Sequence, residues 1–205
     1  MMKKLLIFDL DGVLIDSKNN MKTSWESLSL KYNLNIPFNK YLNFIGLPFE
    51  EILKKLGIKK KFNIYKNYYN YVSKKNIHKI KTFPEVVKTL NIITKKKIKI
   101  AVVTSKDKSR TNKILKKLFK NIKFNLISSP KKKFRSKPSP DLLLNTISSL
   151  NVDPSESLYC GDMVYDLLTA RRAGVMFVFA KYGYSSNLKT KHNIKNFPNI
   201  LKYIK

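Results

Sequence analysis

The stretch LLIFDLDGVLIDS, residues 5–17, places two aspartates directly after an apolar run. A short, continuous apolar segment of this kind is typical of a strand buried on both faces of a parallel sheet. Asp9 and Asp11 are separated by one residue, so their side chains project from the same side of an extended backbone. Two carboxylates this close repel each other unless a cation or a proton lies between them. Mg²⁺ is the natural candidate, because it prefers hard oxygen ligands and the sequence has no cysteine or histidine cluster.

A second acidic pair follows another apolar run, in LYCGDMVYD, residues 158–166. Asp162 and Asp166 are four residues apart and share one face if a helix begins there. A parallel sheet would bring the end of this strand near the end of the first. Helix capping by Asp162 and a favourable position of Asp166 near a helix amino end are the alternative explanation. That alternative accounts for one of these two residues, but it does not explain the coincidence with Asp9 and Asp11.

Short apolar runs and helical patterns alternate along most of the chain. The predicted strands span residues 3–8, 99–104, 124–128, 157–161 and 175–180. Apolar stripes at helical spacing predict helices over residues 84–95, 107–119 and 139–150, the first with Pro84 in its first turn. This alternation predicts an α/β fold with a doubly wound, Rossmann-like parallel sheet.

The segment 17–82 interrupts the alternation. It reads as three consecutive helices, through SWESLSLKY, PFEEILKKL and IYKNYYNYVSKK, and we expect no strand in it. An insertion directly after the first strand would lie over the carboxyl ends of the strands, where open α/β sheets bind their ligands. The sequence therefore predicts a core domain of residues 1–16 and 83–205 and a helical cap domain of residues 17–82.

Two further segments carry candidate anion-binding groups. The strand at 99–104 ends in Thr104 and Ser105, whose hydroxyl or backbone N–H groups can hold an anionic oxygen, although threonine at this place is often a helix cap. Lys137 lies in KPSPD, where prolines restrict the backbone just before a predicted helix. A lysine taken alone is usually a solvated surface residue, and its rigid setting favours a functional role here.

The charge of the chain is its dominant bulk property. Its 205 residues include 42 Lys and Arg against 13 Asp and Glu, for a formal net charge of +29. The excess is nearly all lysine, spread along the whole chain, whereas base reading and bidentate phosphate recognition favour arginine. The spread favours a compositional bias over a dedicated nucleic-acid surface. Repulsion between like charges disfavours self-association, so we expect a monomer.

The remaining bulk features concern the compartment. No apolar run is long enough to span a bilayer, so we expect no membrane segment. Asp9 and Asp11 interrupt the apolar start of the chain and no small-residue cleavage site follows, which argues against a signal peptide. The single cysteine, Cys160, suits a reducing compartment. The sequence therefore predicts a cytoplasmic protein.

Four motifs together resemble one family. FDLDGVLIDS, VVTSK, KPSPDLLL and GDMVYDLLTARRAG occur in the order and spacing of the haloacid dehalogenase superfamily, and most closely of its phosphoglycolate phosphatase and β-phosphoglucomutase branch. The resemblance covers nearly the whole chain, and FIGLPFEEILKKLGI is similar to the cap of those phosphatases. It implies a magnesium-dependent hydrolase of a small phosphomonoester, either phosphoglycolate-like or a sugar phosphate.

The resemblance also implies roles for the acidic residues. Asp9 would be the nucleophile that forms an aspartyl-phosphate intermediate, and Asp11 the general acid and base. Mg²⁺ would contact Asp9, the backbone carbonyl of Asp11 and Asp162, with Asp166 as a direct or indirect ligand. The phosphoryl oxygens would be bound by Thr104, Ser105 and Lys137.

Alternative functions stay open beside this one. A dehalogenase is disfavoured, because those enzymes have no leaving-group oxygen to protonate and typically lack an aspartate at the place of Asp11. The mutase of the same branch uses a histidine in the first cap helix, where this chain has Met21. A basic protein that acts on or binds nucleic acid is the third alternative. The chain also departs from the family in Glu85, where glycine is usual, and in the basic loop at residues 128–138.

Overall fold

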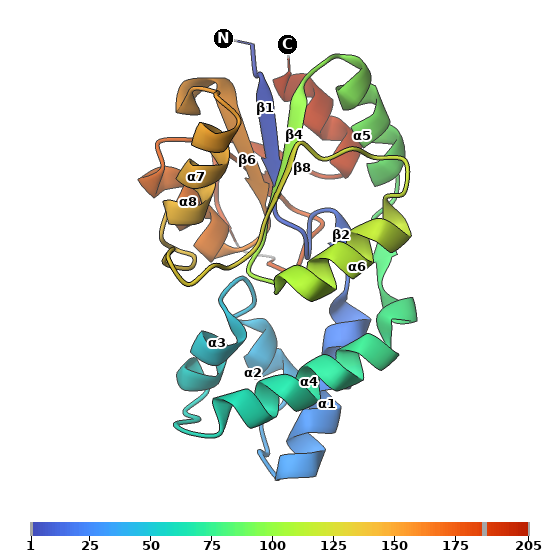
Figure 1. Ribbon diagram of the computed structural model, residues 1–205, viewed down its shortest axis with the longest axis vertical. Coiled ribbons are helices and arrows are strands. Elements are labelled where there is room, and N and C mark those ends of the chain that lie inside the picture. Colours follow the sequence, from blue (N-terminus) through green and yellow to red (C-terminus); the bar gives the residue numbers. More distant parts are fainter. Residues whose placement is uncertain (1, 186–187, 205) are drawn as a thin grey trace.

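A six-stranded sheet forms the centre of the computed structural model, which describes residues 2–185 and 188–204 (Figure 1). In spatial order its strands are β5 (Leu126–Ser128), β4 (Lys99–Val103), β1 (Leu5–Phe8), β6 (Ser157–Gly161), β7 (Met176–Ala180) and β8 (Asn193–Ile194). All pairings between neighbouring strands are parallel. The chain winds outward from β1 in both directions, which confirms the predicted doubly wound Rossmann-like fold.

Helices cover both faces of this sheet (Figure 1). They are α5 (Val86–Lys95), α6 (Lys108–Leu118), α7 (Asp141–Ser149), α8 (Val164–Arg172) and the short 3₁₀ helices η2 (Pro154–Glu156) and η3 (Phe197–Tyr203). Alternate residues of β1 face opposite ways: Leu6 and Phe8 pack with α5, α6 and η3, whereas Leu5 and Ile7 pack with α7 and α8. The complete burial of β1 explains why its sequence is apolar without alternation.

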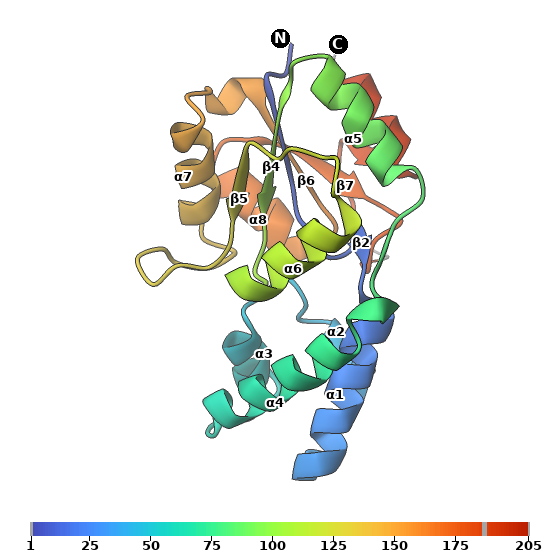
Figure 2. The same ribbon diagram turned by 45° about the vertical axis from the view of Figure 1, so that its right-hand side comes forward.

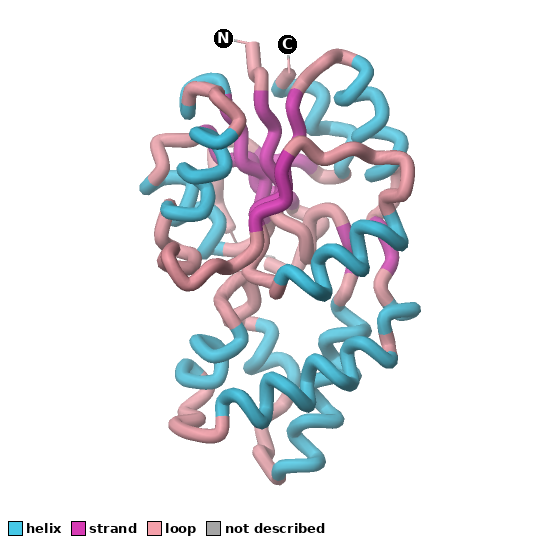
Figure 3. The backbone as a smooth tube through the Cα atoms, viewed as in Figure 1, coloured by secondary structure: helices cyan, strands magenta, loops and turns pink. Residues whose placement is uncertain are grey.

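The segment between β1 and α5 forms a separate helical layer (Figures 1 and 3). Its elements are α1 (Lys18–Tyr32), α2 (Phe38–Leu42), α3 (Phe49–Lys55), α4 (Phe62–Lys75) and η1 (Ile77–Lys79). They pack around a third apolar cluster, which includes Trp25, Tyr41, Leu53 and Tyr69 and which Met163 of the core joins. Burial of this aromatic cluster compensates for the weak helix propensity of a tyrosine-rich sequence.

A two-stranded antiparallel ribbon lies where the chain passes between the sheet and the helical layer (Figure 3). It pairs β2 (Ile15–Asp16) with β3 (Lys81–Thr82), so the outgoing and returning segments lie side by side. The expectation of no strand within 17–82 was therefore wrong at its end, because two-residue strands are too short to show a period. The expectation of three helices there was also incomplete, since α2 is a fourth.

The predicted elements of the core differ from the observed ones mainly at their ends. The strands predicted at 3–8 and 124–128 begin two residues later, at Leu5 and Leu126. Pro84 precedes α5 instead of occupying its first turn, because Glu85 adopts a left-handed backbone with φ of 61° and the helix begins at Val86. The short strand β8 and the helix η3 were not predicted.

Candidate functional site

The two acidic pairs meet at the carboxyl ends of adjacent strands. Asp9 continues the ladder of β1, with its backbone N–H donating to the carbonyl of Cys160 at 2.9 Å, and Asp162 follows β6 directly. Asp166 lies in the first turn of α8. One carboxylate oxygen from each of Asp9, Asp162 and Asp166 lies within 4.8 Å of the others, and all three residues are buried. The predicted convergence is therefore present for three of the four aspartates, and Asp11 lies outside the group.

Lys137 connects this acidic cluster. Its Nζ lies 2.8 Å from Oδ1 of Asp9 and 2.7 Å from Oδ1 of Asp166, and its side chain is 3% exposed. Burial alone would lower the pKa of Lys137, but the charges of Asp166 and Asp9 outweigh burial and raise it. Burial raises the pKa of Asp9 to about 7, with the charge of Lys137 opposing the change. The lysine predicted from KPSPD thus lies inside the site as a fixed cation.

Asp166 is held on both carboxylate oxygens. Oδ1 accepts hydrogen bonds from Lys137 and from the hydroxyl of Tyr159 at 2.8 Å. Oδ2 accepts from the backbone N–H of Met163 at 3.1 Å, which also fixes the start of α8. This carboxylate is therefore oriented by the core, and its hydrogen-bonding capacity is largely used.

The hydrogen bonding of Asp162 differs from that of Asp166. Its Oδ2 accepts from the backbone N–H of Tyr184 at 2.7 Å, but its buried Oδ1 has no hydrogen-bond partner among residues 2–185 and 188–204. Burial, followed by the charges of Asp166 and Asp9, raises its pKa well above the usual range. Gly12, at φ of 83°, makes room for it, because a Cβ there would lie 2.0 Å from Oδ2 of Asp162. Buried carboxylate oxygens are normally hydrogen-bonded, so this oxygen of Asp162 is a candidate ligand for a cation. Together with the nearby carboxylates of Asp9 and Asp166 it offers the oxygen ligands that a divalent cation prefers.

Asp11 faces a different set of partners. Its Oδ1 accepts from Nζ of the buried Lys106 at 3.1 Å and from the hydroxyl of Ser17, which also contacts the hydroxyl of Tyr184. Its carboxylate does not belong to the group of Asp9, Asp162 and Asp166. Burial lowers the pKa of Lys106, while the charge of Asp11 opposes the change. Two aspartates separated by one residue are therefore paired with different lysines.

Thr104 and Ser105 both border the site but use their hydroxyls differently. Oγ1 of the buried Thr104 accepts from the backbone N–H of Lys106 at 3.1 Å, which fixes the turn after β4. Oγ of Ser105 donates to the carbonyl of Gly46 in the helical layer at 2.6 Å. The structure therefore places Thr104 with the core and makes Ser105 a contact between the two layers.

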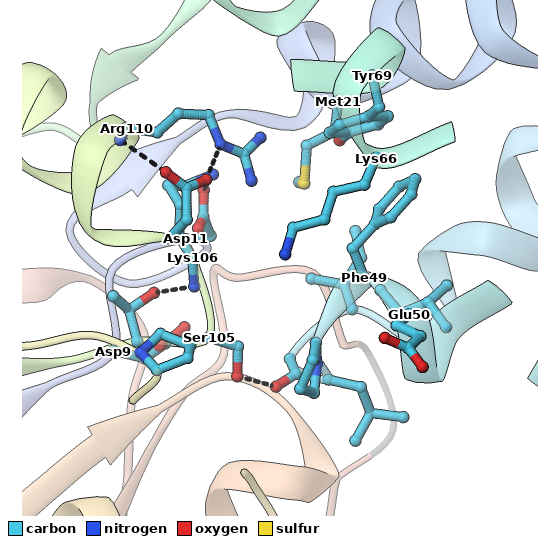
Figure 4. Close-up of a pocket in the computed structure, with 18 of the residues that line it drawn as sticks. Asp9, Asp11, Met21, Phe49, Glu50, Lys66, Tyr69, Ser105, Lys106 and Arg110 are labelled. Atoms are coloured by element: carbon cyan, nitrogen blue, oxygen red, sulfur yellow. Dashed lines mark hydrogen bonds and ion pairs between the residues drawn. The ribbon is translucent and has the colours of Figure 1, made fainter. Parts of the chain in front are cut away.

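A cavity of about 270 Å³ lies between the sheet edge and the helical layer (Figure 4). Asp9, Asp11, Thr104 and Ser105 form part of its core side, together with Lys106 and Arg110. Its other side consists of residues from α1 to α4, including Met21, Phe49, Lys66 and Tyr69. Lys137, Asp162 and Asp166 are buried and do not line this cavity, although Lys137 contacts Asp9. The arrangement can bring a small molecule to Asp9 and Asp11, which border the cavity.

Several of these residues were not singled out from the sequence. Lys106 is the last residue of VVTSK and was assigned no role, because one more lysine carries little information in a chain with 42 Lys and Arg. Its position directly after the strand-end residues Thr104 and Ser105 was the available signal. Lys66 and Arg110 reach the cavity only because of how the helical layer and α6 are placed, which local sequence does not reveal.

The surface outside the cavity is strongly basic. The loop between β5 and α7, which contains the run KKKFR at 131–135, projects from the edge of the sheet (Figure 2).

Among the described residues, no helix combines the length and the apolar character that a membrane crossing requires.

Comparison with known proteins agrees with this geometry. The chain is 29% identical over 187 residues to a phosphoglycolate phosphatase from Aquifex aeolicus, covering 88% of this chain and 86% of that one. It is 30% identical over 185 residues to a putative pyrophosphatase PpaX from Clostridium perfringens, covering 88% and 85% of the two chains.

Solved structures show the same fold. A putative phosphoglycolate phosphatase from Lactobacillus plantarum superposes with a TM-score of 0.91 at 23% identity, covering 99% of this chain and 100% of that one. The family model described as haloacid dehalogenase-like hydrolase matches residues 6–180, which include both acidic pairs, Thr104 and Lys137. The resemblance seen in the motifs is confirmed, and the chain belongs to the haloacid dehalogenase-like hydrolase family.

Proposed function

We propose that the protein is a magnesium-dependent phosphatase that hydrolyses a small phosphomonoester through an aspartyl-phosphate intermediate on Asp9. The observation that carries the proposal is the position of Asp9. Its carboxylate borders the cavity on one side, and on the other it contacts Lys137 and the buried group of Asp162 and Asp166. The names of the relatives, phosphoglycolate phosphatase and pyrophosphatase, support the same reaction class.

The acidic cluster fits a magnesium ion, because Oδ1 of the buried Asp162 has no hydrogen-bond partner in the described part of the chain. Asp9 and Asp162 would hold the ion, together with the backbone carbonyl of Asp11, while Asp166 orients Lys137 and the start of α8. When bound, the ion would offset the negative charge of the carboxylates and of the phosphoryl group.

The first chemical step belongs to Asp9. One oxygen of its carboxylate attacks phosphorus as the bond to the leaving oxygen breaks, which gives an acyl phosphate on Asp9. Lys137 holds Oδ1 of Asp9 at 2.8 Å and provides a fixed positive charge beside the transferring group. Thr104 borders the same space and would contribute a polar contact to a phosphoryl oxygen.

Proton transfer belongs to Asp11. In its protonated form it gives its proton to the leaving alcohol, and its carboxylate then takes a proton from the water that hydrolyses the acyl phosphate. Lys106 and Ser17 orient Oδ1 of Asp11, so the second oxygen is the one available to the leaving group. Ser17 directly precedes α1, which links the orientation of Asp11 to the helical layer.

We infer that residues 1–16 and 83–205 act as the core domain and residues 17–82 as a cap domain that covers the site. The separate apolar cluster of the helical layer and the ribbon of β2 and β3 at the junction support this division. Closure of the cap would exclude water from the acyl phosphate until Asp11 activates one molecule.

A mutase of the β-phosphoglucomutase type is the second candidate. That reaction returns the phosphoryl group to a bound sugar, and it relies on a histidine in the first cap helix. Met21 is the residue of α1 that borders the cavity, and its thioether can neither donate nor accept the proton. We therefore favour transfer to water.

Phosphate release from a panel of phosphomonoesters tests the proposal. Release that requires magnesium and disappears in Asp9→Asn is the expected result, because an amide is a poor nucleophile and cannot form the acyl phosphate. Isomer exchange of a sugar phosphate without phosphate release would instead support the mutase. Absence of both reactions in folded, magnesium-loaded protein would count against either enzyme.

A further inference from the structure

The cavity is lined by four acidic and four basic side chains, which differ in how they are paired. Every lining carboxylate has a cationic partner: Asp9 with Lys137, Asp11 with Lys106, Asp107 with Arg110 and Glu50 with Lys54. Two lining lysines, Lys66 and Lys108, have no carboxylate within 4.0 Å of Nζ in the part of the chain that the structure describes. Lys66 and Lys108 are therefore lining cations that no carboxylate among the described residues pairs with.

Lys66 is the member of this pair that belongs to the helical layer. It extends from α4 into the cavity, toward the side on which Asp9, Asp11 and Lys106 lie (Figure 4). Its helix is fixed over the cavity by Tyr69, whose ring lies 5.7 Å from the guanidinium carbon of Arg110 and 4.8 Å from the ring of Phe49. The ammonium therefore faces the substrate space from across the reacting carboxylates.

Lys66 and Lys137 lie on opposite sides of the reacting carboxylates, so they would contact different parts of the substrate. Lys137 is buried against Asp9 and serves the group that Asp9 attacks. An ammonium on the cap side would lie beside the leaving group, in a cavity whose other cap-side walls are largely apolar or aromatic, including Ile45, Phe49 and Tyr69. A charged donor beside apolar walls favours an anion over a hydroxyl group, because charge-assisted hydrogen bonds are stronger than neutral ones.

We propose that the substrate carries a second anionic group, a carboxylate or a phosphoryl group on the leaving side, and that Lys66 binds it. The proposal rests on the proposed function, because it assumes that Asp9 attacks the first phosphoryl group. Lys66 is a specificity-determining residue in this proposal and takes no part in bond breaking.

Paired substrates test the proposal by kinetics. The second anionic group is a carboxylate in phosphoglycolate and a phosphoryl group in pyrophosphate, whereas ethyl phosphate has a neutral leaving group of similar size to glycolate. Lys66→Met is expected to lower the ratio of kcat/KM for the first two substrates to that for ethyl phosphate by about tenfold or more. Lys66→Arg should retain most of the preference, because it keeps the charge.

A matched control comes from the same helix. Lys74 is exposed on α4 and does not line the cavity, so Lys74→Met removes the same charge from the protein without altering the site. Its substrate ratios should equal those of the unmodified protein. The proposal would be overturned if Lys66→Met had the same substrate ratios as the unmodified protein, or if Lys74→Met lowered them as much as Lys66→Met does. A larger loss with phosphoglycolate identifies the second anion as a carboxylate, and a larger loss with pyrophosphate identifies it as a phosphoryl group.

A binding measurement separates this proposal from the proposed function. Calorimetric titration of Asp9→Asn with phosphoglycolate and with ethyl phosphate reports affinity without turnover. Affinity for phosphoglycolate that falls about tenfold when Lys66→Met is added supports the second anion site, even if the unmodified protein releases no phosphate from any ester. Unchanged affinity, or no binding, rejects the site, whereas magnesium-dependent phosphate release by the unmodified protein would still support the phosphatase.

Discussion

Asp9 and Asp11 lie two residues apart, but their surroundings differ. Asp9 belongs to a buried region held entirely by core elements, in which Lys137, Asp162 and Asp166 surround it. Asp11 belongs to a region at the junction, in which Lys106 comes from the core and Ser17 from the start of the helical layer. In the proposed mechanism, one short segment after a strand would therefore serve two tasks: Asp9 belongs to a buried charge cluster, and Asp11 is a proton donor whose orientation depends on the helical layer.

The two regions also differ in how their charges are balanced. Four charged side chains meet in the first region, three of them acidic, and one carboxylate oxygen has no donor among the described residues. We therefore expect a bound cation to complete this region. In the second region Asp11 and Lys106 balance each other, and no further charge is required. Substitutions in the first region should therefore affect stability in addition to activity, whereas substitutions in the second should affect mainly activity.

The largest expected effect comes from removing the central cation of the first region. Lys137→Met leaves Asp9 and Asp166 buried without their partner, so the free energy of unfolding should fall by about 3–5 kcal/mol. Chemical denaturation of the magnesium-free protein measures this loss. Lys106→Met is the matched comparison, since it removes one lysine that serves one carboxylate, and its loss should be smaller. An equal loss in both variants would contradict the proposed difference between the regions.

The second region is tested by leaving groups of different acidity. Asp11→Asn removes the proton donor, so kcat for an alkyl phosphate should fall about 10²- to 10³-fold. With p-nitrophenyl phosphate the fall in the acylation step should be much smaller, because that leaving group departs without a proton. Pre-steady-state release of nitrophenol isolates this step from hydrolysis of the intermediate. A similar loss with both leaving groups would show that Asp11 does not protonate the leaving oxygen.

Asp162 provides a test of where magnesium binds in the first region. Asp162→Asn removes a buried carboxylate whose pKa is raised, so the magnesium-free variant should unfold at a higher temperature than the unmodified protein. Magnesium should stabilise the unmodified protein by about 2.7 kcal/mol at 100 times its Kd, and the variant by much less. Thermal unfolding with and without magnesium measures both effects. A variant that is stabilised by magnesium as much as the unmodified protein would place the ion elsewhere.

The first region was largely predictable from the sequence. Its acidic residues directly follow two apolar runs, and the parallel pairing of β1 with β6 was enough to bring them together. Lys137 was singled out because Pro138 and Pro140 follow it directly before a predicted helix. The proximity of the three aspartates was predictable because each lies directly after a strand or in the first turn of a helix, so local sequence determines its place.

The second region depended on tertiary structure. Lys106 and Ser17 meet at Asp11 only because the ribbon of β2 and β3 positions the start of α1 over the end of β4. Lys66 reaches the cavity because the aromatic cluster fixes α4 across it. Nothing in the local sequence separates these lysines from the others in a chain with a net charge of +29.

The smallest predicted effect concerns the return from the helical layer to the core. Glu85 precedes α5 with φ of 61°, a conformation that costs a residue with a Cβ about 1 kcal/mol and costs glycine little. Its ion pair with Lys88 is exposed and contributes little in compensation. Glu85→Gly should therefore stabilise the protein by about 0.5–1 kcal/mol. Glu85→Ala loses the same ion pair but keeps the Cβ, so denaturant unfolding of both variants separates backbone strain from charge. A gain in the glycine variant alone indicates strain, whereas equal behaviour of the two variants would show that the left-handed backbone costs nothing here.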